Sequence, residues 1–352
     1  NGTAAGTLTA SGRIVNVTNS TGGTFAKKGD KIQFIYALSD CEWANNATKQ
    51  AILGFCFTVA YDEAVLEFVP KSGVNPSKDN MVAAKDLNIS GNASPGKLTL
   101  LGDANTLESF WNAVAGDFFV LDFIVKSTTN NDVSITVGND VTYGSFDGNI
   151  KAATVNAQPI PKFTIDNTVP KISLDGEVCT ADTAKLDYSP VTVGATDETS
   201  NDVTMTLDGK AFTSGTSFNA TTGVFTATDS AKNTATLTLT VDTTKLNELQ
   251  NIINALVIDV NKMDYAKTST IINEINDKQM KLSLKAQAKL KSSRYIEAVR
   301  VLDTIETAIK TLDAKMLNLN PNSIKFDSNI EINAINAEAD KLLANNNVAK
   351  SV

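Results

Sequence analysis

The chain lacks histidine altogether, and its 352 residues include only three cysteines and two tryptophans. Without an imidazole, the Ser-His-Asp and Cys-His arrangements of nucleophilic catalysis are excluded, and so are histidine-ligated zinc sites. No P-loop, G-x-S-x-G or G-x-G-x-x-G motif lies between a strand pattern and a helix pattern. A glycosidase needs only two carboxylates, but no segment is as long as the usual catalytic scaffolds. We therefore expect no catalytic residue, no cofactor and no enzymatic activity.

Positive charge is also scarce, with 31 Lys and Arg against 39 Asp and Glu and a net charge of −8. Nucleic-acid binding needs clustered basic side chains, and the one basic stretch, residues 278–300, has a helical pattern. No apolar run approaches the ~20 residues of a membrane span. We expect neither a nucleic-acid partner nor a membrane span. The chain begins at Asn1 without a leader, which fits a mature secreted protein or a piece of a longer one.

The three cysteines do not suggest a disulfide framework. Cys41 and Cys56 flank a polar loop between two expected strands, and Cys179 lies in a different segment. Because an odd number argues against a framework, buried free thiols are the favoured interpretation. A Cys41–Cys56 disulfide across a hairpin remains the alternative.

The pattern of the sequence changes once, near Thr243. Before it, Thr, Val and Phe alternate with polar residues, and after it, Leu, Ile and Ala recur every three or four positions. The hydrophobic content of 42% allows buried cores, and the length suits two to four domains. The expected fold class is multidomain and mainly β, with β-sandwiches followed by a C-terminal α-helical bundle.

Residues 1–160 contain runs of β-branched and aromatic residues separated by Gly, Asn, Asp and Pro clusters. Alternate positions such as Phe119, Leu121 and Phe123 are apolar, which places one face of a strand in a core. Such strands and turns predict a β-sandwich of the jelly-roll type. The expected strands are Arg13–Val17, Lys31–Leu38, Ile52–Ala60, Val65–Val69, Lys97–Leu101, Phe118–Val125, Val133–Val137 and Ile150–Val155.

Four blocks follow one another in this segment: Gly29-Asp30-Lys31-Ile32, residues 54–68 with Tyr61-Asp62, residues 98–104, and residues 119–125. Their order and spacing resemble the cohesin domain. The resemblance implies a β-sandwich that binds a dockerin helix on one sheet face. It also implies that this face includes the strand and loop after Tyr61-Asp62 and the strand Lys97–Leu101.

Three residues are candidates for partner binding: Trp43, Tyr61 and Asp62. Trp43 lies in a polar loop, where an exposed Trp can stack on a sugar ring or anchor a protein partner. Capping the sandwich core is the alternative for Trp43 and the favoured role for Trp111 in another loop. Tyr61 and Asp62 end one strand with a turn beside the implied face.

Residues 161–243 form a second β segment. Leu207-Asp208-Gly209-Lys210 predicts a hairpin with a two-residue turn, and Leu237, Leu239 and Val241 alternate in a last strand. Together with the run from Gly223 to Asn233, this pattern resembles the immunoglobulin-like domains of bacterial surface proteins. Lys232 stands where that pattern usually has Gly.

Residues 244–317 show three apolar stripes with helical spacing, which predict a three-helix bundle. Asp264 and either Ser292 or Ser293 are expected N-caps. Ile253-Asn254-Ala255-Leu256 and Leu282-Ser283 resemble the helical repeats of Firmicutes surface proteins, which implies a spacer or adhesive module. Residues 318–352 form an Asn-rich tail with one possible helix after Asp327.

Metal binding is expected at most in the form of structural calcium. The run from Asp259 to Thr270 has Met263, Asp264 and Thr270 at positions five, six and twelve, where an EF-hand needs an oxygen ligand, a glycine and an acidic residue. Asp264 is therefore better interpreted as a helix cap. The acidic loops could hold calcium at a domain junction, although solvated charge is the favoured interpretation. The residues concerned are Asp166, Asp197, Glu198 and Asp202.

These features predict a non-catalytic secreted or cell-surface protein. Its first domain would bind a protein partner such as a dockerin-like module, and the remaining segments would hold that domain away from the cell. One alternative is a self-assembling subunit of a surface layer, pilus or fibre, whose partner is another copy of the chain. A second alternative is a carbohydrate-binding adhesin with a glycan partner.

Overall fold

The computed structural model describes residues 6–19, 23–41, 51–71, 80–82, 88–103, 114–145, 149–259, 262–317 and 337. The chain divides into two compact units. The first comprises Asn1–Ser173, Gly194–Ser214 and Thr226–Thr236, and the second comprises Leu174–Val193, Gly215–Phe225 and Leu237–Val352. The division into four segments at residues 160, 243 and 317 stays a prediction.

The first β segment has two five-stranded sheets. One has the order β12-β1-β3-β8-β5 and the other the order β11-β10-β4-β7-β6. β1 pairs with β12 in parallel, and the other neighbouring strands of both sheets are antiparallel. The strands are β1 (Thr7–Asn16), β3 (Lys31–Ser39), β4 (Ala51–Tyr61), β5 (Leu66–Val69), β6 (Asn88–Ser94), β7 (Lys97–Asp103), β8 (Gly116–Val125), β10 (Ile135–Ser145), β11 (Asn149–Ala152) and β12 (Thr154–Ala157).

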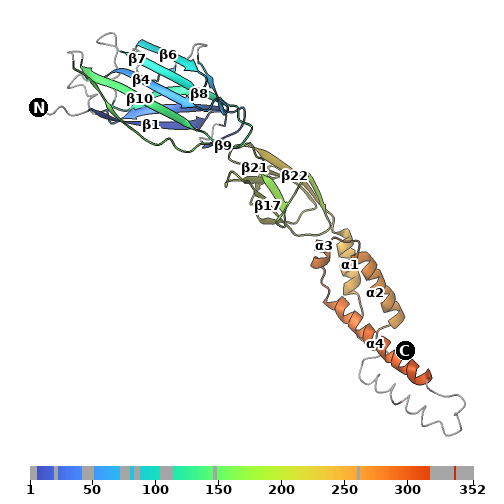
Figure 1. The fold of residues 1–352 in the computed structure, drawn as a ribbon. Coiled ribbons are helices and arrows are strands. Elements are labelled where there is room, and N and C mark those ends of the chain that lie inside the picture. The colour runs from blue at the N-terminus through green and yellow to red at the C-terminus, as the bar shows by residue number, and fades with distance from the viewer. Residues whose placement is uncertain are drawn as a thin grey trace, which may run out of the picture. The chain divides into compact units, whose positions relative to one another are not determined.

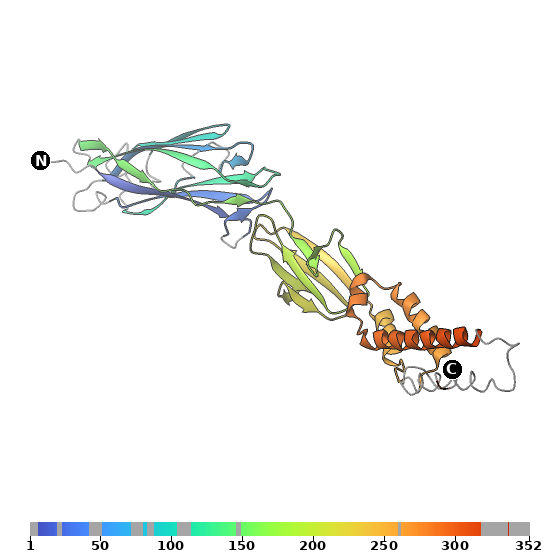
Figure 2. The same cartoon turned by 60° about the horizontal axis from the view of Figure 1, so that its bottom comes forward.

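The two sheets form the layers of a sandwich (Figure 2), and β10, β4, β7 and β6 lie side by side in one of them (Figure 1). Alternate residues of strands such as β3 and β7 are buried between the layers, as the alternation in the sequence predicts. In β8 the alternation breaks, because Phe118 and Phe119 are both buried where the register with β3 shifts. Tyr36 of β3 stacks on Phe119 of β8 with ring centroids 5.1 Å apart and meets Phe57 of β4 edge-on at 5.7 Å. Each such aromatic pair adds about 0.5–1.5 kcal/mol beyond its burial.

Several features of this sandwich differ from the expectation. β1 begins at Thr7 and not at Arg13, and β10 spans Ile135–Ser145 where a strand was expected over Val133–Val137. A single strand was expected over residues 150–155, but the chain changes sheets at Ala153. The Ala153 N–H donates to Val141 of β10 in one sheet, and the Thr154 N–H donates to Gly6, which precedes β1 in the other. The polar strand β6 was not expected, because its pairing with β7, and not an apolar alternation, holds it in the sheet.

Three further sheets have the orders β2-β13-β9, β15-β14-β17-β20 and β16-β22-β21-β18-β19. In the first of them β13 of the second β segment pairs with β2 and β9, which belong to the first β segment, and the other two sheets consist of strands of the second segment alone. They confirm a β-rich segment before the helices, while the resemblance to immunoglobulin-like domains stays a prediction. The strands are β2 (Phe25–Ala26), β9 (Asn131–Asp132), β13 (Thr164–Ile165), β14 (Lys171–Leu174), β15 (Glu177–Val178), β16 (Thr183–Leu186), β17 (Val191–Thr196), β18 (Thr204–Leu207), β19 (Lys210–Phe212), β20 (Thr216–Phe218), β21 (Thr222–Thr228) and β22 (Thr234–Val241).

The expected two-residue hairpin turn is present between β18 and β19. Asp208 and Gly209 have φ angles of 50° and 77°, so both central residues are left-handed, as a type I′ turn requires. Lys232 also has a left-handed φ of 66°. The position where the resembling pattern has Gly therefore does need a conformation that Gly adopts easily.

The C-terminal helices are α1 (Thr244–Asn254), α2 (Tyr265–Gln279), α3 (Leu284–Lys289) and α4 (Ser293–Leu317). Asp264 caps α2 as expected, because its side chain accepts a hydrogen bond from the Lys267 N–H at 3.0 Å. The short α3 was not expected. Ser283 caps it and itself donates to Asp187. None of the helices in the described residues is long and apolar enough to cross a membrane.

Candidate functional site

The outer surface of the sheet that contains β4 and β7 is built from small side chains. We call it the β4–β7 face. Its register is unbroken from Gly54 to Ala60 of β4, where Cys56 lies opposite Leu101 of β7 on one side and Asp140 of β10 on the other. Its residues are Thr136, Gly138, Asp140 and Thr142 of β10, Gly54, Cys56, Thr58 and Ala60 of β4, Lys97, Thr99, Leu101 and Asp103 of β7, and Ser90, Asn92 and Ser94 of β6.

Leu101 is the large apolar side chain of this face, and it is 43% exposed. Small residues surround it, since Cys56 and Ser90 lie opposite it on the neighbouring strands. The charged groups of Lys97 and Asp103 lie at the two ends of β7 and take part in none of the ion pairs among the described residues. The face thus combines small side chains, one apolar centre and two charges that belong to no ion pair among the described residues.

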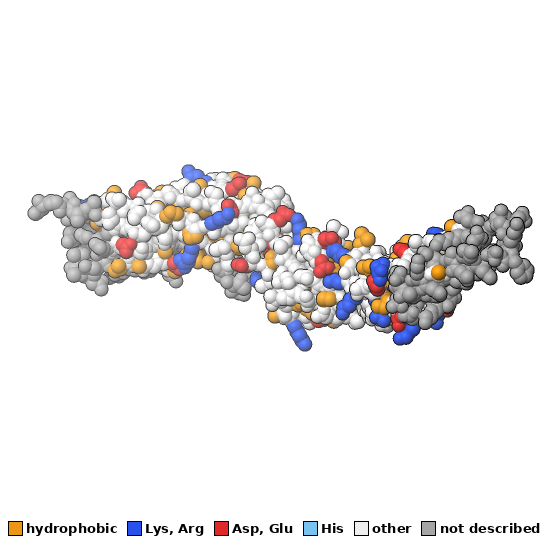
Figure 3. Space-filling model, turned by 90° about the horizontal axis from the view of Figure 1, so that it is seen from below, with side chains coloured by type: hydrophobic (Ala, Val, Ile, Leu, Met, Phe, Trp, Pro, Cys, Tyr) orange, Lys and Arg blue, Asp and Glu red, His pale blue; other side chains and the backbone are white. Residues whose placement is uncertain are grey.

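The outer surface of the opposite sheet has a different character. Arg13 of β1 donates two hydrogen bonds to Asp117 of β8, at 2.8 and 2.9 Å, and this guanidinium lowers the pKa of Asp117. Lys31 of β3 lies 2.7 Å from Asp122 of β8, which also accepts from Gln33. These four charged side chains therefore neutralise one another in pairs. On the view drawn in Figure 3, Lys and Arg side chains are likewise interspersed with Asp and Glu.

Two of the three residues proposed for partner binding have structural roles. The Tyr61 ring packs edge-on against Phe123 at 5.0 Å, and its partial burial raises the pKa of its phenol. Asp62 forms the turn after β4, because its carboxylate accepts from the Ala64 N–H at 2.8 Å. Trp43 and Trp111 lie outside the described residues. Partner contacts of Trp43, Tyr61 and Asp62 stay a prediction.

The face implied by the sequence is divided by the fold. β7 belongs to the β4–β7 face, whereas β5, the strand after Tyr61-Asp62, belongs to the opposite sheet. The two strands therefore cannot share one binding face. The chain crosses between the layers in the turn at Asp62, and a pattern of separate blocks does not show such a crossing.

The three cysteines are free thiols. Cys41 is buried directly after β3, and burial together with the charge of Asp40 raises its pKa to about 11. Cys56 lies on the β4–β7 face and is partly exposed.

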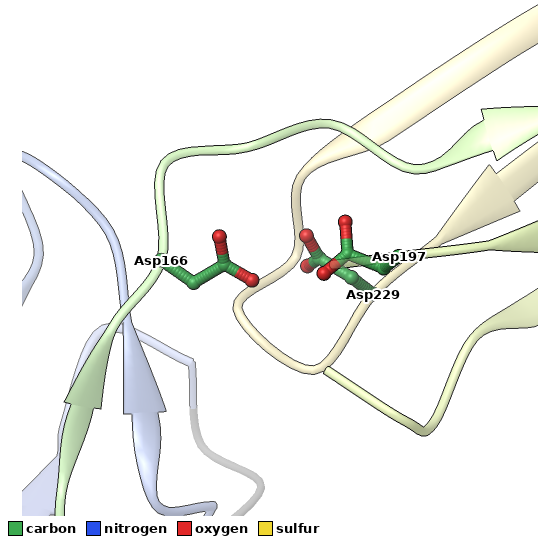
Figure 4. A group of neighbouring side chains, drawn as sticks. All are labelled: Asp166, Asp197 and Asp229. Carbon is green, nitrogen blue, oxygen red and sulfur yellow. The ribbon is translucent and has the colours of Figure 1, made fainter. Parts of the chain in front are cut away.

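Three carboxylates meet elsewhere in the first unit, at the ends of three strands (Figure 4). Asp166 follows β13, Asp197 follows β17 and Asp229 follows β21. One oxygen from each lies within 4.8 Å of the others, and Asp166 and Asp229 are buried with exposures of 0% and 2%. We call these three residues the Asp166 cluster.

Backbone groups hold one oxygen of two of these carboxylates. Asp166 Oδ1 accepts from the Thr168 N–H at 3.0 Å, and Asp197 Oδ1 accepts from the N–H groups of Thr199 and Ser200. The Oδ2 atoms of Asp166 and Asp197 are buried and accept no hydrogen bond from the described residues. The third carboxylate, Asp229, accepts from the backbone and side-chain nitrogens of Asn233 at 2.8 and 2.9 Å.

The Asp166 cluster concentrates negative charge in a small volume. None of the ion pairs among the described residues includes a member of the cluster. Two like charges 4.8 Å apart repel by roughly 3 kcal/mol at an effective dielectric constant of about 20. Burial raises the pKa of Asp166, and the charges of Asp197 and Asp229 raise it further, whereas the Thr168 N–H and the Thr199 side chain lower it.

Only part of this cluster was anticipated from the sequence. Asp166 and Asp197 come together, but Glu198 pairs with Lys171 and Asp202 is exposed outside the cluster. Asp229 was missed, although it stands in the hairpin run from Gly223 to Asn233 that carried the resemblance to immunoglobulin-like domains. Its position directly after a strand, four residues before a polar Asn, was the available signal.

Comparisons with known proteins identify the first segment. The family model of the cohesin domain matches residues 15–160, which confirms the resemblance over that range. No curated protein matches the chain. The resemblances of residues 161–243 and 244–317 to surface-protein modules stay predictions.

The solved structures found to be similar include several cohesins. One is the OlpC cohesin of Clostridium thermocellum in a complex with Doc435, with 18% identity, 47% of this chain and 97% of that chain covered, and a TM-score of 0.33. Another is the sixth cohesin of scaffoldin B of Acetivibrio cellulolyticus with a Cel5 dockerin. It has 21% identity, 45% of this chain and 97% of that chain covered, and a TM-score of 0.31. A third is a non-cellulosomal cohesin of Archaeoglobus fulgidus, with 18% identity, 46% of this chain and 92% of that chain covered, and a TM-score of 0.30.

Proposed function

Since residues 15–160 form a cohesin domain, we propose that this protein is a non-catalytic binding protein that captures a dockerin-like module on the β4–β7 face. This surface is chosen because Leu101 is exposed at its centre. The names of two similar structures, which describe cohesin–dockerin complexes, support the class of partner.

The dimensions of the β4–β7 face suit one helix. Four strands about 4.8 Å apart give a surface roughly 14 Å wide, and an α-helix with its side chains is about 10–12 Å across. The small side chains Thr58, Thr99 and Gly138 form one row across the sheet, so a helix can approach the backbone closely there. Leu101 stands beside this row and offers the helix an apolar anchor of the kind that dominates interface energetics.

The charges at the ends of β7 suggest the orientation of such a helix. Lys97 lies at one end of β7 and Asp103 at the other, and Asp140 of β10 lies in the row of Leu101, beyond Cys56 of β4. A helix carries partial positive charge at its N-terminus and partial negative charge at its C-terminus. We infer that a bound helix directs its N-terminus to Asp103 and its C-terminus to Lys97.

The remaining segments are proposed to act as a spacer. Their resemblance to immunoglobulin-like domains and helical repeats of bacterial surface proteins supports a location outside the cell or on its surface. Fractionation of the producing cells tests this location, since recovery of the chain in the cytosol alone would contradict it.

Binding to a panel of immobilised dockerin modules, measured by surface plasmon resonance, tests the proposed partner. The variant Leu101→Arg should weaken binding about 30-fold or more, which corresponds to ~2 kcal/mol, because a charge replaces the apolar anchor. Val17→Arg is the matched control, since Val17 is 40% exposed and follows β1 in the opposite sheet. Its affinity should equal that of the wild type.

Two outcomes would overturn the proposal. Equal binding by the wild type and Leu101→Arg would exclude the β4–β7 face. If no dockerin of the panel binds and electron microscopy shows polymers whose amount depends on protein concentration, self-assembly would replace dockerin capture as the function.

A further inference from the structure

The Asp166 cluster has the donor set of a hard divalent cation. All three side chains offer carboxylate oxygens, the ligands that calcium and magnesium prefer over nitrogen or sulfur. Calcium–oxygen bonds of about 2.3–2.6 Å place two ligands of one ion at most about 5 Å apart. The mutual distances within 4.8 Å satisfy this condition for all three carboxylates.

A second observation points to a ligand independently of the charge. Asp166 is completely buried, and its Oδ2 accepts no hydrogen bond from the described residues. Figure 4 shows this carboxylate turned towards Asp197 and Asp229. Buried polar atoms are almost always satisfied, and an ionised one that lacks a partner is costly. A cation among the three carboxylates removes that cost for the Oδ2 atoms of both Asp166 and Asp197.

The surroundings hold the carboxylates in place before any ion binds. Each of Asp166 and Asp197 uses one oxygen as an acceptor for backbone N–H groups and leaves the other one available. Asn233 holds Asp229 and also donates to the Asp166 backbone carbonyl at 2.9 Å. Carboxylate oxygens have two lone pairs, so the hydrogen bonds to Asp229 leave it able to coordinate. Such outer contacts are typical of built metal sites.

We propose that Asp166, Asp197 and Asp229 bind one calcium ion. Calcium is preferred to magnesium because it accepts six to eight oxygens in flexible geometry and takes carboxylates in one- or two-oxygen contacts, whereas magnesium demands a near-ideal octahedron and keeps its waters. The ion neutralises the cluster and ties the chain after β13 to the ends of β17 and β21. It therefore stabilises the first unit and makes that stability depend on calcium.

Isothermal titration of the full chain with CaCl2, after removal of metal with EDTA, tests the site. Dissociation constants of extracellular calcium modules are on the order of 0.1–1 mM, so titration to about 10 mM covers the range. One site is expected in the wild type, with an increase in melting temperature of several degrees at saturation. Asp166→Asn and Asp197→Asn should weaken binding at least tenfold.

Asp202→Asn is the matched control, because it removes one negative charge from an exposed position five residues beyond Asp197. It should bind calcium like the wild type. The melting temperature of Asp166→Asn in EDTA shows whether this variant folds. It should equal or exceed that of the wild type, since the change removes charge repulsion with Asp197 and Asp229 and keeps the side-chain volume. A merely structural Asp166 would give a lower melting temperature instead.

The proposal fails if the wild type shows neither heat of binding nor a melting shift at about 10 mM CaCl2, a concentration well above the range of such sites. It also fails if Asp166→Asn and Asp197→Asn both respond to calcium like Asp202→Asn. An equal or larger effect of MgCl2 at the same concentration would overturn the choice of calcium.

Discussion

The side-chain nitrogen of Asn233 donates a hydrogen bond of 2.9 Å to the backbone carbonyl oxygen of Asp166. The two residues are 67 positions apart, and Asn233 is only 9% exposed. The same Asn233 donates twice to Asp229, through its backbone and its side chain. The buried Asn233 amide therefore connects the ends of β13 and β21, and it holds Asp166 and Asp229 of the Asp166 cluster.

Replacing Asn233 by Ala should destabilise the first unit by about 2 kcal/mol. The change removes two side-chain hydrogen bonds and leaves the Asp166 carbonyl buried without its partner. Urea unfolding in EDTA measures the effect without any contribution of metal. The control Asn219→Ala changes an exposed residue before β21 and should stay within about 0.5 kcal/mol of the wild type. Equal midpoints for the two variants would contradict the role of Asn233.

Lys232→Gly should stabilise the protein by about 1 kcal/mol. Lys232 has a φ of 66°, a left-handed conformation that costs a residue with a Cβ roughly 1–2 kcal/mol and that Gly adopts readily. The backbone carbonyl of residue 232, which accepts from Lys27, is kept. Thermal unfolding should show a melting temperature higher by several degrees. Lys210→Gly, in strand β19, should lower it, and a decrease in both variants would contradict the prediction.

The parts of the fold with an apolar alternation were predictable from the sequence. β3 places Phe34 and Tyr36 in the core, as its period of two indicates, and β8 adds Phe119 and Phe123. The burial of Phe118 beside Phe119 was not predictable, because it arises where the register between β3 and β8 shifts. β6 was not predictable, because residues 88–94 are mostly polar and are held by pairing with β7. The change of sheets at Ala153 depends on two backbone hydrogen bonds to distant strands, and the local sequence contains no sign of them.

The candidate sites were predictable only as residue types. Asp166 and Asp197 were recognised as acidic loop residues, but their convergence with Asp229 depends on three strand ends that only the folded chain brings together. Glu198 adjoins Asp197 and yet pairs with Lys171, because neighbouring residues at a strand end point in different directions. Leu101 was expected as one residue of a strand, and its exposure among small side chains is a property of the whole sheet.

The sandwich should lose stability as the pH rises above 10, because the buried phenol of Tyr36 then loses its proton on unfolding. Burial raises the pKa of its phenol to about 12, against an ordinary value of 10.0. Because the folded state holds this proton more tightly than the unfolded state, the stabilisation is complete below pH 10 and is lost as the pH rises towards 12. The loss amounts to at most about 3 kcal/mol.

Tyr36→Phe isolates that contribution, since it removes the ionisable group and also the hydrogen bond to Asn139. The variant should be less stable at pH 8, and its deficit should shrink between pH 10 and pH 12 as the wild type loses the contribution of Tyr36. Urea unfolding at several pH values gives both curves. A constant difference between the two proteins across this range would contradict the assignment.

Lys97→Glu should slow the association with a dockerin module and leave the fold intact. Lys97 is exposed at the end of β7 and belongs to none of the ion pairs among the described residues, so the change breaks no such pair. If the C-terminus of a bound helix approaches Lys97, reversal of the charge replaces attraction by repulsion. Rim charges act mainly on the association rate, so the effect should be about tenfold in low salt and smaller in high salt.

Lys210→Glu makes the same charge change at an exposed site outside the cohesin domain and should leave the rate nearly unchanged. Stopped-flow measurements at two ionic strengths distinguish the cases, because an equal effect of both variants would reflect net charge and would contradict the inferred orientation of the helix.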